Sequence, residues 1–340
     1  MFEEAQRVTG YATKGRALVG PADFGGQCLV GECDFDAALL LPTTSYFGLP
    51  KASSYLYGTW RDGDGNMLRA LRGVESAAST FRYLFVSDSG GQLELDPDAD
   101  AGLWSGPTEI RRDGAGGVDM ASVGADEAVA FHYRHEPRSC HWSDGAFLDV
   151  SGDLVGPGLQ WFNPWPGGGC YSVTAKYRSR GTFLGRAVEG FIGHEIHYFP
   201  PNVSWMQSPY GLGREICWQQ IANEYDDGTL IQATFAYGND GWGFAMLHGE
   251  QGTFHCTTDV EVTATVRPNG YPETVNYRFL GQSWTWQIDP QGERARTIPG
   301  APLGADGTCT RDGDDRKVRY SMGNSDWWTD GRADRIIRSS

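Results

Sequence analysis

Hydrophobic and polar positions alternate over short runs in this chain, and turn-forming residues end most of these runs. The segments SYLYGTW, TFRYLFVS and REICWQQIANEY have the strand period of two, which places successive side chains on opposite faces of a sheet. Asp-Gly or Gly-Gly pairs follow in RDGDGN, DSGG and DDG, and they are strong local signals for hairpins. The pattern predicts an all-β chain that folds as antiparallel sandwiches or barrels.

Both halves of the chain show the same pattern of short strands separated by turns. YGTWRDGDGNMLRAL in the first half resembles ANEYDDGTLIQAT in the second, which favours duplication, although Asp-Gly turns recur in any chain rich in hairpins. The Pro- and Gly-rich stretch Val155 to Ser172 has the composition of a domain junction. A length of 340 residues also exceeds the usual size of a single core. The sequence therefore predicts two β domains, residues 1–160 and 161–340.

Composition supports the β assignment and restricts the partners. The chain has 47 Gly, 12 Trp, 15 Tyr and 16 Phe, and aromatic residues suit pleated, half-buried surfaces joined by glycine turns. A formal net charge of −15 argues against binding to nucleic acid or to anionic membrane surfaces. No run of 18 apolar residues occurs, so no membrane-spanning helix is expected.

The N-terminus and the cysteines bear on the cellular compartment. MFEEAQRVTGYATKGRALVG has no basic segment followed by an apolar run, so no signal peptide is expected. The seven cysteines are odd in number and scattered, which favours reduced structural thiols over a disulfide framework. We expect a cytoplasmic protein that is a monomer or a homodimer.

The main candidate for chemistry is the stretch EGFIGHEIHYFPPNVSW, residues 189–205. On a strand, Glu195 and His197 share one face, whereas His194 points to the other face unless a bulge intervenes. A zinc-protease motif needs H-E-x-x-H on a helix, and this stretch has a different spacing on a strand. Three interpretations remain: an acid–base pair, a metal site completed by a residue such as His248 or His255, and polar residues without chemistry. We expect no metal and favour the acid–base pair.

Aromatic and polar residues near this stretch are candidates for a binding pocket, although each tryptophan also suits a packed core. Trp205 follows the double proline and is the best candidate for the mouth of a pocket. Trp218 and Gln220 share a face of their strand, which suits a partly polar interior. The predicted substrate-binding residues are Trp205, Trp218, Tyr198, Trp165 and Gln220.

The segment AVEGFIGHEIHYF resembles a stretch of the carotenoid 1,2-hydratase-like and AttH-like proteins, which reads approximately G-x-a-W-x-D-H-x-W. Gly190 and His194 match this motif, and Glu195 follows the histidine as it does in some members. Gly193 stands where the family has an Asp, and His197 stands where it has the final Trp. The likeness extends weakly over residues 40–290.

This resemblance implies paired lipocalin-like β-barrel domains, in a superfamily that includes tocopherol cyclases, hydratases and other cyclases. It also implies that no cofactor is needed and that the substrate is a hydrophobic terpenoid, polyketide or aromatic compound. The hypothesis is a lyase or isomerase that hydrates, dehydrates, isomerises or cyclises such a molecule by proton transfer. Glu195 and His197 would transfer the proton, and His194 would orient or share it.

Two other classes stay open at this stage. The same barrel would serve a carrier that binds a hydrophobic ligand without chemistry. A carbohydrate-active β-sandwich is the other alternative, since the chain is rich in Trp and carboxylates.

Overall fold

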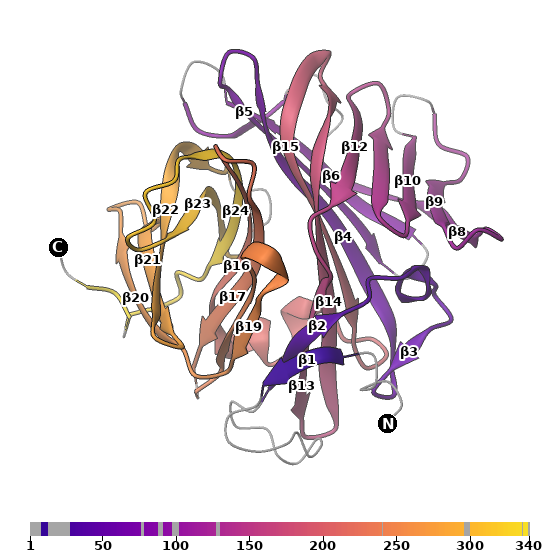
Figure 1. The fold of residues 1–340 in the computed structure, drawn as a ribbon. Helices are drawn as coiled ribbons and strands as arrows, with labels where there is room; N and C mark the ends of the chain where they lie inside the picture. The colour runs from indigo at the N-terminus through magenta and orange to yellow at the C-terminus, as the bar shows by residue number, and fades with distance from the viewer. Residues whose placement is uncertain are drawn as a thin grey trace.

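The computed structural model describes residues 8–12, 28–75, 78–87, 91–96, 102–126, 130–239, 241–295, 300–334 and 336–338 (Figure 1). Two curled antiparallel sheets make up the structure, and they lie side by side. The predicted all-β class with two antiparallel sheets is therefore confirmed.

The first sheet contains the strands of the N-terminal part of the chain. They are β1 (Val8–Ala12), β2 (Leu29–Cys33), β3 (Ser45–Tyr46), β4 (Leu49–Asp62), β5 (Met67–Glu75), β6 (Ala78–Val86), β7 (Glu94–Leu95), β8 (Gly102–Arg112), β9 (Val118–Ser122), β10 (Phe131–Glu136), β11 (Ser139–Asp144), β12 (Leu148–Leu154), β13 (Gly158–Trp165), β14 (Gly168–Phe183) and β15 (Arg186–Tyr198). Its order is β1-β2-β13-β14-β12-β11-β10-β9-β8-β6-β5-β4-β15, and β15 also pairs with β14. That last pairing closes the curled sheet on itself.

The second sheet contains the strands that follow. They are β16 (Glu215–Tyr225), β17 (Leu230–Gly238), β18 (Gly243–His248), β19 (Phe254–Thr257), β20 (Glu261–Val266), β21 (Pro272–Phe279), β22 (Gln282–Glu293), β23 (Leu303–Arg311) and β24 (Val318–Trp327). Their order is β19-β18-β17-β16-β24-β23-β22-β21-β20. Short helical segments complete the described structure: η1 (Ala37–Leu40), η3 (Trp205–Gln207), η4 (Tyr210–Arg214) and η5 (Glu250–Gly252).

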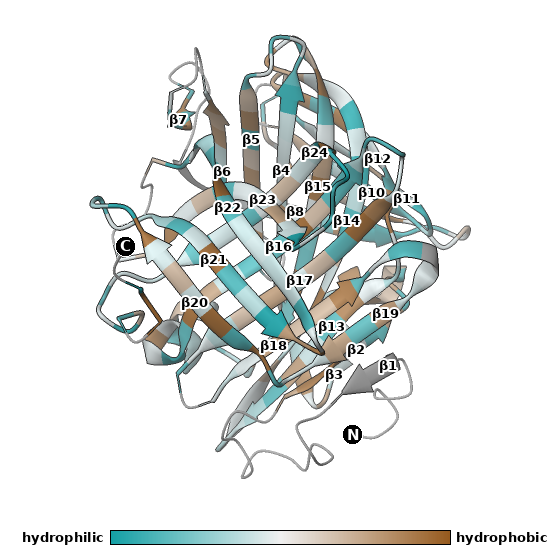
Figure 2. Ribbon diagram, turned by 60° about the vertical axis from the view of Figure 1, so that its left-hand side comes forward, coloured by the Kyte–Doolittle hydropathy of each residue, from teal (hydrophilic) through white to brown (hydrophobic). Residues whose placement is uncertain are grey.

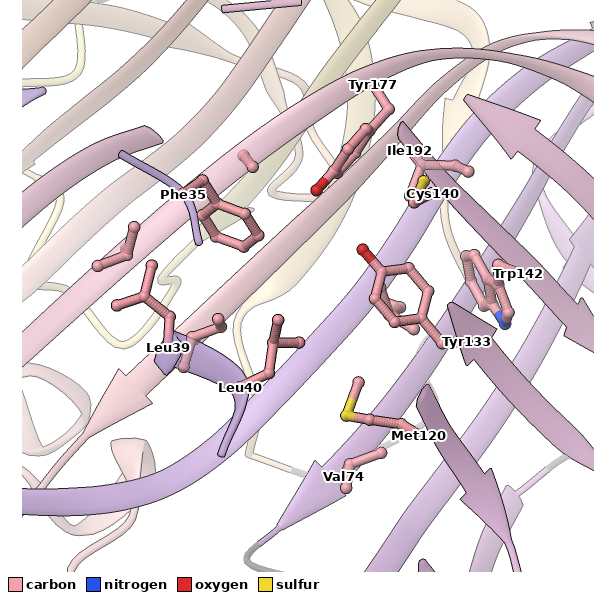
Figure 3. Close-up of a cluster of buried hydrophobic side chains, with 14 of the residues drawn as sticks. Phe35, Leu39, Leu40, Val74, Met120, Tyr133, Cys140, Trp142, Tyr177 and Ile192 are labelled. Carbon is pink, nitrogen blue, oxygen red and sulfur yellow. The ribbon is translucent and has the colours of Figure 1, made fainter. Parts of the chain in front are cut away.

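The period of two along the strands gives each sheet a hydrophobic inner face. Within the first sheet, alternate residues such as Ile192 and Ile196 of β15 join a buried cluster, part of which Figure 3 shows. A second cluster fills the curl of the other sheet, and Figure 2 shows hydrophobic and hydrophilic residues interleaved along strands such as β21. The other face of β15 packs toward the second sheet through Phe191, and so does Phe199, the residue that follows the strand. The chain thus has a core inside each sheet and a third layer between them.

The chain passes from the first sheet to the second further along the sequence than the predicted boundary between residues 160 and 161. That boundary falls inside β13, which pairs with β2 and β14 of the first sheet. The change of sheet occurs between β15 and β16, across residues 199–214. The Pro- and Gly-rich stretch that suggested a junction forms the β13–β14 hairpin instead, because these residues suit tight turns as well as linkers.

Two further features of the sequence have a structural counterpart. All seven cysteines are free thiols, and all but Cys256 are buried. Across the described part of the chain, no helix has the length and apolar character that crossing a membrane requires.

Candidate active site

The side chains of Glu195 and His197 lie on the face of β15 that points toward the second sheet. Glu195 lies opposite Tyr55 of β4 on one side and Thr174 of β14 on the other. The β4–β15 register does contain an irregularity, but it falls after His197 and leaves the pair on one face. His197 Nε2 lies 3.7 Å from Glu195 Oε1. The predicted pairing of these two residues on one face agrees with this geometry.

Glu195 forms part of the wall of a cavity of about 250 Å³ between the two sheets. The first sheet and the η3 segment supply Tyr55, Tyr57, Arg69, Leu71, Phe85, Glu195, Trp205 and Met206, and the second sheet with its β22–β23 connection supplies Arg294, Ala295, Ala301, Pro302, Gly304, Asn324 and Asp326. The lining combines aromatic and aliphatic side chains with a few polar groups. This combination is typical of sites that bind small organic molecules.

Burial controls the charge state of Glu195. The residue is 7% exposed, and no described residue forms a hydrogen bond to its carboxyl group. Burial raises the pKa of Glu195 to about 8, the nearby Lys176 opposes this shift, and Asp326 adds to it. Because a carboxyl group with this pKa keeps its proton at neutral pH, Glu195 is a carboxylic acid there and can donate a proton.

His197 is also uncharged at neutral pH, because burial lowers its pKa to about 3. Its ring contacts those of Tyr55, Phe199 and Trp205, with centroids 5.4, 5.9 and 5.7 Å away. Its Nδ1 atom is buried without a partner among the described residues. Glu195 and His197 therefore form a neutral acid beside a neutral imidazole, and they do not form an ion pair.

Lys176 of β14 is the cation that opposes the rise in the Glu195 pKa. Its Nζ donates to Thr174 Oγ1 at 2.8 Å and to Thr234 Oγ1 of the second sheet at 2.9 Å. Burial lowers the pKa of Lys176 to about 7, against an opposing effect of Glu195. An amine with this pKa exchanges protons readily at neutral pH, and its charged form would stabilise a Glu195 carboxylate.

The wall of the cavity also holds a buried cluster that sequence analysis did not find. Arg69 Nη1 of β5 donates to Asp306 Oδ1 of β23 at 2.8 Å, and its Nη2 donates to Asn324 Oδ1 of β24 at 2.7 Å. Arg294 Nη2, at the end of β22, donates to the same Asn324 oxygen at 2.9 Å. The four side chains come from β5, β23, β24 and the residue after β22, so no local spacing relates them. A signal was nonetheless present, since Arg69 lies among the apolar residues Met67, Leu68, Ala70 and Leu71.

The structure places His194 away from this cavity. Its side chain points into the first sheet, where Nδ1 lies 3.0 Å from Tyr133 Oη. Figure 3 shows Tyr133 and Tyr177 of this interior, with their hydroxyl groups facing the space between them. Burial lowers the pKa of His194 well below its usual value. Because the sheet separates His194 from Glu195, a proton shared directly between them has no support in this geometry.

Of the predicted pocket residues, Trp205 lies in the cavity wall. Its ring stacks on Tyr210 with centroids 5.2 Å apart, and Trp218 lies 6.0 Å from it in the layer between the sheets. Gln220 is buried in the same layer, where its Oε1 accepts from Thr234 Oγ1 at 2.9 Å. Trp218 and Gln220 thus support the site from behind its surface.

The remaining two predicted pocket residues have other surroundings. Tyr198 points into the first sheet, and its hydroxyl donates to the Leu39 carbonyl at 2.7 Å. Trp165 packs against Phe199 and Tyr210 in the layer between the sheets. The position of Tyr198 follows from strand alternation, because Tyr198 lies one residue past His197 and so faces the opposite way.

The metal interpretation of the HEIH stretch required a third ligand. The described residues contain no group of three or more His, Cys, Asp or Glu side chains placed to hold a metal ion together. His248 and His255 belong to β18 and β19 of the second sheet. The sequence-based preference for an acid–base pair stays a prediction that rests on the chemistry of Glu195.

Fold and site together define an all-β protein with two curled antiparallel sheets and a protonated carboxyl group in the cavity between them. No protein-family model and no curated protein matches the chain. Solved structures that resemble it include a Nitrosomonas europaea protein provisionally assigned as AttH, with 15% identity, a TM-score of 0.48, and coverage of 93% of this chain and 98% of the other.

Two further solved structures resemble this chain. One is CghA in complex with Sch210972, with 12% identity, a TM-score of 0.48, and coverage of 89% of this chain and 99% of the other. The second is kievitone hydratase from Nectria haematococca, with 11% identity, a TM-score of 0.45, and coverage of 92% of this chain and 99% of the other.

Proposed function

We propose that this protein is an enzyme that donates a proton to a hydrophobic small molecule bound between the two sheets. The reaction would be a hydration, dehydration, isomerisation or cyclisation, as the sequence resemblance implies, with the protein's own side chains as acid and base. The observation that supports this proposal most directly is that the Glu195 carboxyl group is buried in the cavity wall and has a pKa raised to about 8. A general acid works best when its pKa lies near the operating pH.

Each neighbour of Glu195 has a role in this proposal. After Glu195 gives up its proton, the carboxylate that forms lies within the field of Lys176, which favours the charged form. The neutral His197 imidazole lies 3.7 Å from the carboxyl group and would exchange a proton with it. The faces of Trp205, Tyr55 and Tyr57 line the cavity and would stabilise positive charge that develops on a protonated alkene.

Replacement of Glu195 by Gln tests this role, because Gln has nearly the same shape and no proton to donate. General acid catalysis contributes roughly 10²–10⁴-fold, so Glu195→Gln should lower turnover by that factor while ligand binding and thermal stability change little. Glu189→Gln is the matched control, since Glu189 is on the same strand but its side chain is 45% exposed and paired with Arg178. This control should keep full turnover.

The measurement begins with native mass spectrometry of the purified protein, which would identify a bound apolar molecule as the first substrate candidate. Incubation of that molecule with enzyme in D₂O then shows whether deuterium enters the product. Infrared spectroscopy adds a test without substrate: at neutral pH the carbonyl band of protonated carboxylic acids should be weaker in Glu195→Gln than in wild type. Equal turnover in wild type and Glu195→Gln would exclude Glu195 as the acid. A ligand recovered unchanged, with no exchange, would instead favour the carrier.

A further inference from the structure

The wall of the cavity presents hydrogen-bond donors that the proton-donor role of Glu195 does not use. Asn324 Oδ1 accepts from both Arg69 Nη2 and Arg294 Nη2, which fixes the amide so that Nδ2 faces outward as a donor. Arg294 Nη1 has no hydrogen-bond partner among the described residues. The Tyr57 hydroxyl, in the same cavity, is likewise unpaired within the described structure. Three donors therefore surround one cavity.

The charges behind these donors balance. Arg69 and Arg294 are two cations, and Asp306 lies 2.8 Å from Arg69 Nη1 and 3.3 Å from Arg294 Nε. Asp326 lies 3.5 Å from Arg294 Nη2, and its side chain is 38% exposed. Two guanidinium groups thus face two carboxyl groups. Such a wall offers directed N–H groups without a large excess of positive charge, and it therefore suits a neutral oxygen acceptor better than an anion.

The donor groups are held rigidly. A Cβ atom on Gly304 would lie 2.4 Å from Arg294 Cζ, so the guanidinium group lies against the bare backbone of β23. Its Nη2 also donates to the Ser325 carbonyl at 3.0 Å. Donors fixed in this way need no reorganisation when a ligand arrives, and they are most effective where negative charge develops on an oxygen atom.

From this geometry we propose that Arg294, Asn324 and Tyr57 bind the carbonyl oxygen of the substrate, which is an apolar compound with a ketone conjugated to its unsaturated skeleton. The proposal rests on the proposed function for one point, namely that the skeleton lies against Glu195 across the cavity. Leu71, Phe85 and Trp205 supply the apolar surface for the skeleton. Hydrogen bonds from these donors would stabilise negative charge that develops on the carbonyl oxygen.

A matched pair of probes tests the proposal without knowledge of the natural substrate. 2-Acetonaphthone and 2-isopropenylnaphthalene have the same shape, but the first has a C=O group where the second has C=CH₂. Wild-type protein should bind the ketone about 10-fold more tightly, as expected from one or two net hydrogen bonds. The infrared stretching band of the bound ketone should move to lower wavenumber. 2-Naphthoate, the anionic analogue, should bind more weakly than the ketone.

Substitutions locate the effect. Asn324→Asp keeps an acceptor for both arginines and replaces the donating Nδ2 by an oxygen, so the preference for the ketone and the shift of its band should both be lost. Arg294→Met should also abolish the preference, whereas Arg111→Met, at a side chain that is 72% exposed, should preserve it. Thermal unfolding of each variant would verify that it is folded.

Several results would overturn the proposal. Equal binding of the two neutral probes, no binding of either, or a preference that survives in Asn324→Asp would remove the carbonyl site, and tighter binding of 2-naphthoate would replace it by an anion site. Glu195→Gln should keep the ketone preference. The two proposals can thus be refuted separately, because binding measurements test the carbonyl site and turnover measurements test the proton donor.

Discussion

At the scale of single residues, burial decides what Glu195 and His197 can do. Both side chains are nearly removed from water, and burial is the largest influence on the pKa of each. Burial disfavours the charged form of either group, so the carboxyl group keeps its proton and the imidazole gives its proton up. A pair that would form an ion pair in water is therefore neutral in this cavity, and Glu195 becomes an acid at neutral pH.

This charge state predicts how stability depends on pH. The pKa of Glu195 rises from 4.5 to about 8 on folding, so between these values the folded state holds a proton that the unfolded state has lost. The free energy of unfolding must then decrease as pH rises through this window. Glu195→Gln lacks this dependence, so the melting temperature of wild type should fall relative to the variant between about pH 6.5 and about pH 8.

That range separates the effect of Glu195 from that of His197. His197 has a pKa lowered from 6.5 to about 3, so its contribution to stability is lost only as pH falls below about 6.5. Thermal unfolding of wild type, Glu195→Gln and the control Glu189→Gln measures the difference. A constant offset between wild type and Glu195→Gln over the whole range would contradict the raised pKa of Glu195.

At the scale of the element, β15 needs a glycine at position 193 to hold the site. Gly193 lies between Tyr57 of β4 and Lys176 of β14 on the face that carries Glu195. A Cβ atom at this position would lie 2.2 Å from the Tyr57 ring. The absence of a side chain lets the Tyr57 ring lie across β15 and border the cavity. The motif that this segment resembles has an Asp at this position, whereas this chain has Gly193 with the Tyr57 ring beside it.

Gly193→Ala should therefore displace the Tyr57 ring. Overpacking of this kind costs about 1–3 kcal/mol of stability, and the displaced ring should also weaken binding of a naphthyl ketone in the cavity. Gly63→Ala is the matched control, because a Cβ atom there meets no atom within 4 Å. Urea unfolding and a fluorescence titration measure the two effects. Equal stability of the two variants would show that the Tyr57 ring has room to move.

At the scale of the whole molecule, polar contacts join the two sheets across the cavity. Asp306 of β23 accepts from Thr59 Oγ1 of β4 at 2.8 Å and from Arg69 Nη1 of β5 at 2.8 Å. The sheets are joined a second time by the ion pair between Arg61 and Asp289, whose side chains are 31% and 17% exposed. The first contact is fully buried and the second is not, although both connect the same two sheets.

These two contacts should differ strongly in energy. Asp306→Ala leaves the buried guanidinium of Arg69 without its carboxylate and should cost about 3–5 kcal/mol of unfolding free energy. Asp289→Ala breaks a partly exposed pair and should cost less than about 1 kcal/mol. Urea denaturation of both variants measures the difference. Similar small losses in both would mean that Asp306 does not hold the sheets together.

The strand pattern predicted much of this molecule because it is a local property. The alternation along residues 189–199 specified the all-β class and placed Glu195 and His197 on one face, since successive side chains on any strand point in opposite directions. The same rule placed Trp218 and Gln220 together. None of these inferences needed to know which strand lies beside β15.

What lies across from a residue depends on pairings between distant parts of the chain, and only the tertiary structure decided it. Arg69, Arg294 and Asn324 meet because β5, β22 and β24 border one cavity, although about 250 residues separate Arg69 from Asn324. The side of the sheet that His194 faces, and the place where one sheet gives way to the next, were decided in the same way. The raised pKa of Glu195 also belongs to the fold, because its largest cause is burial, which depends on how the strands pack.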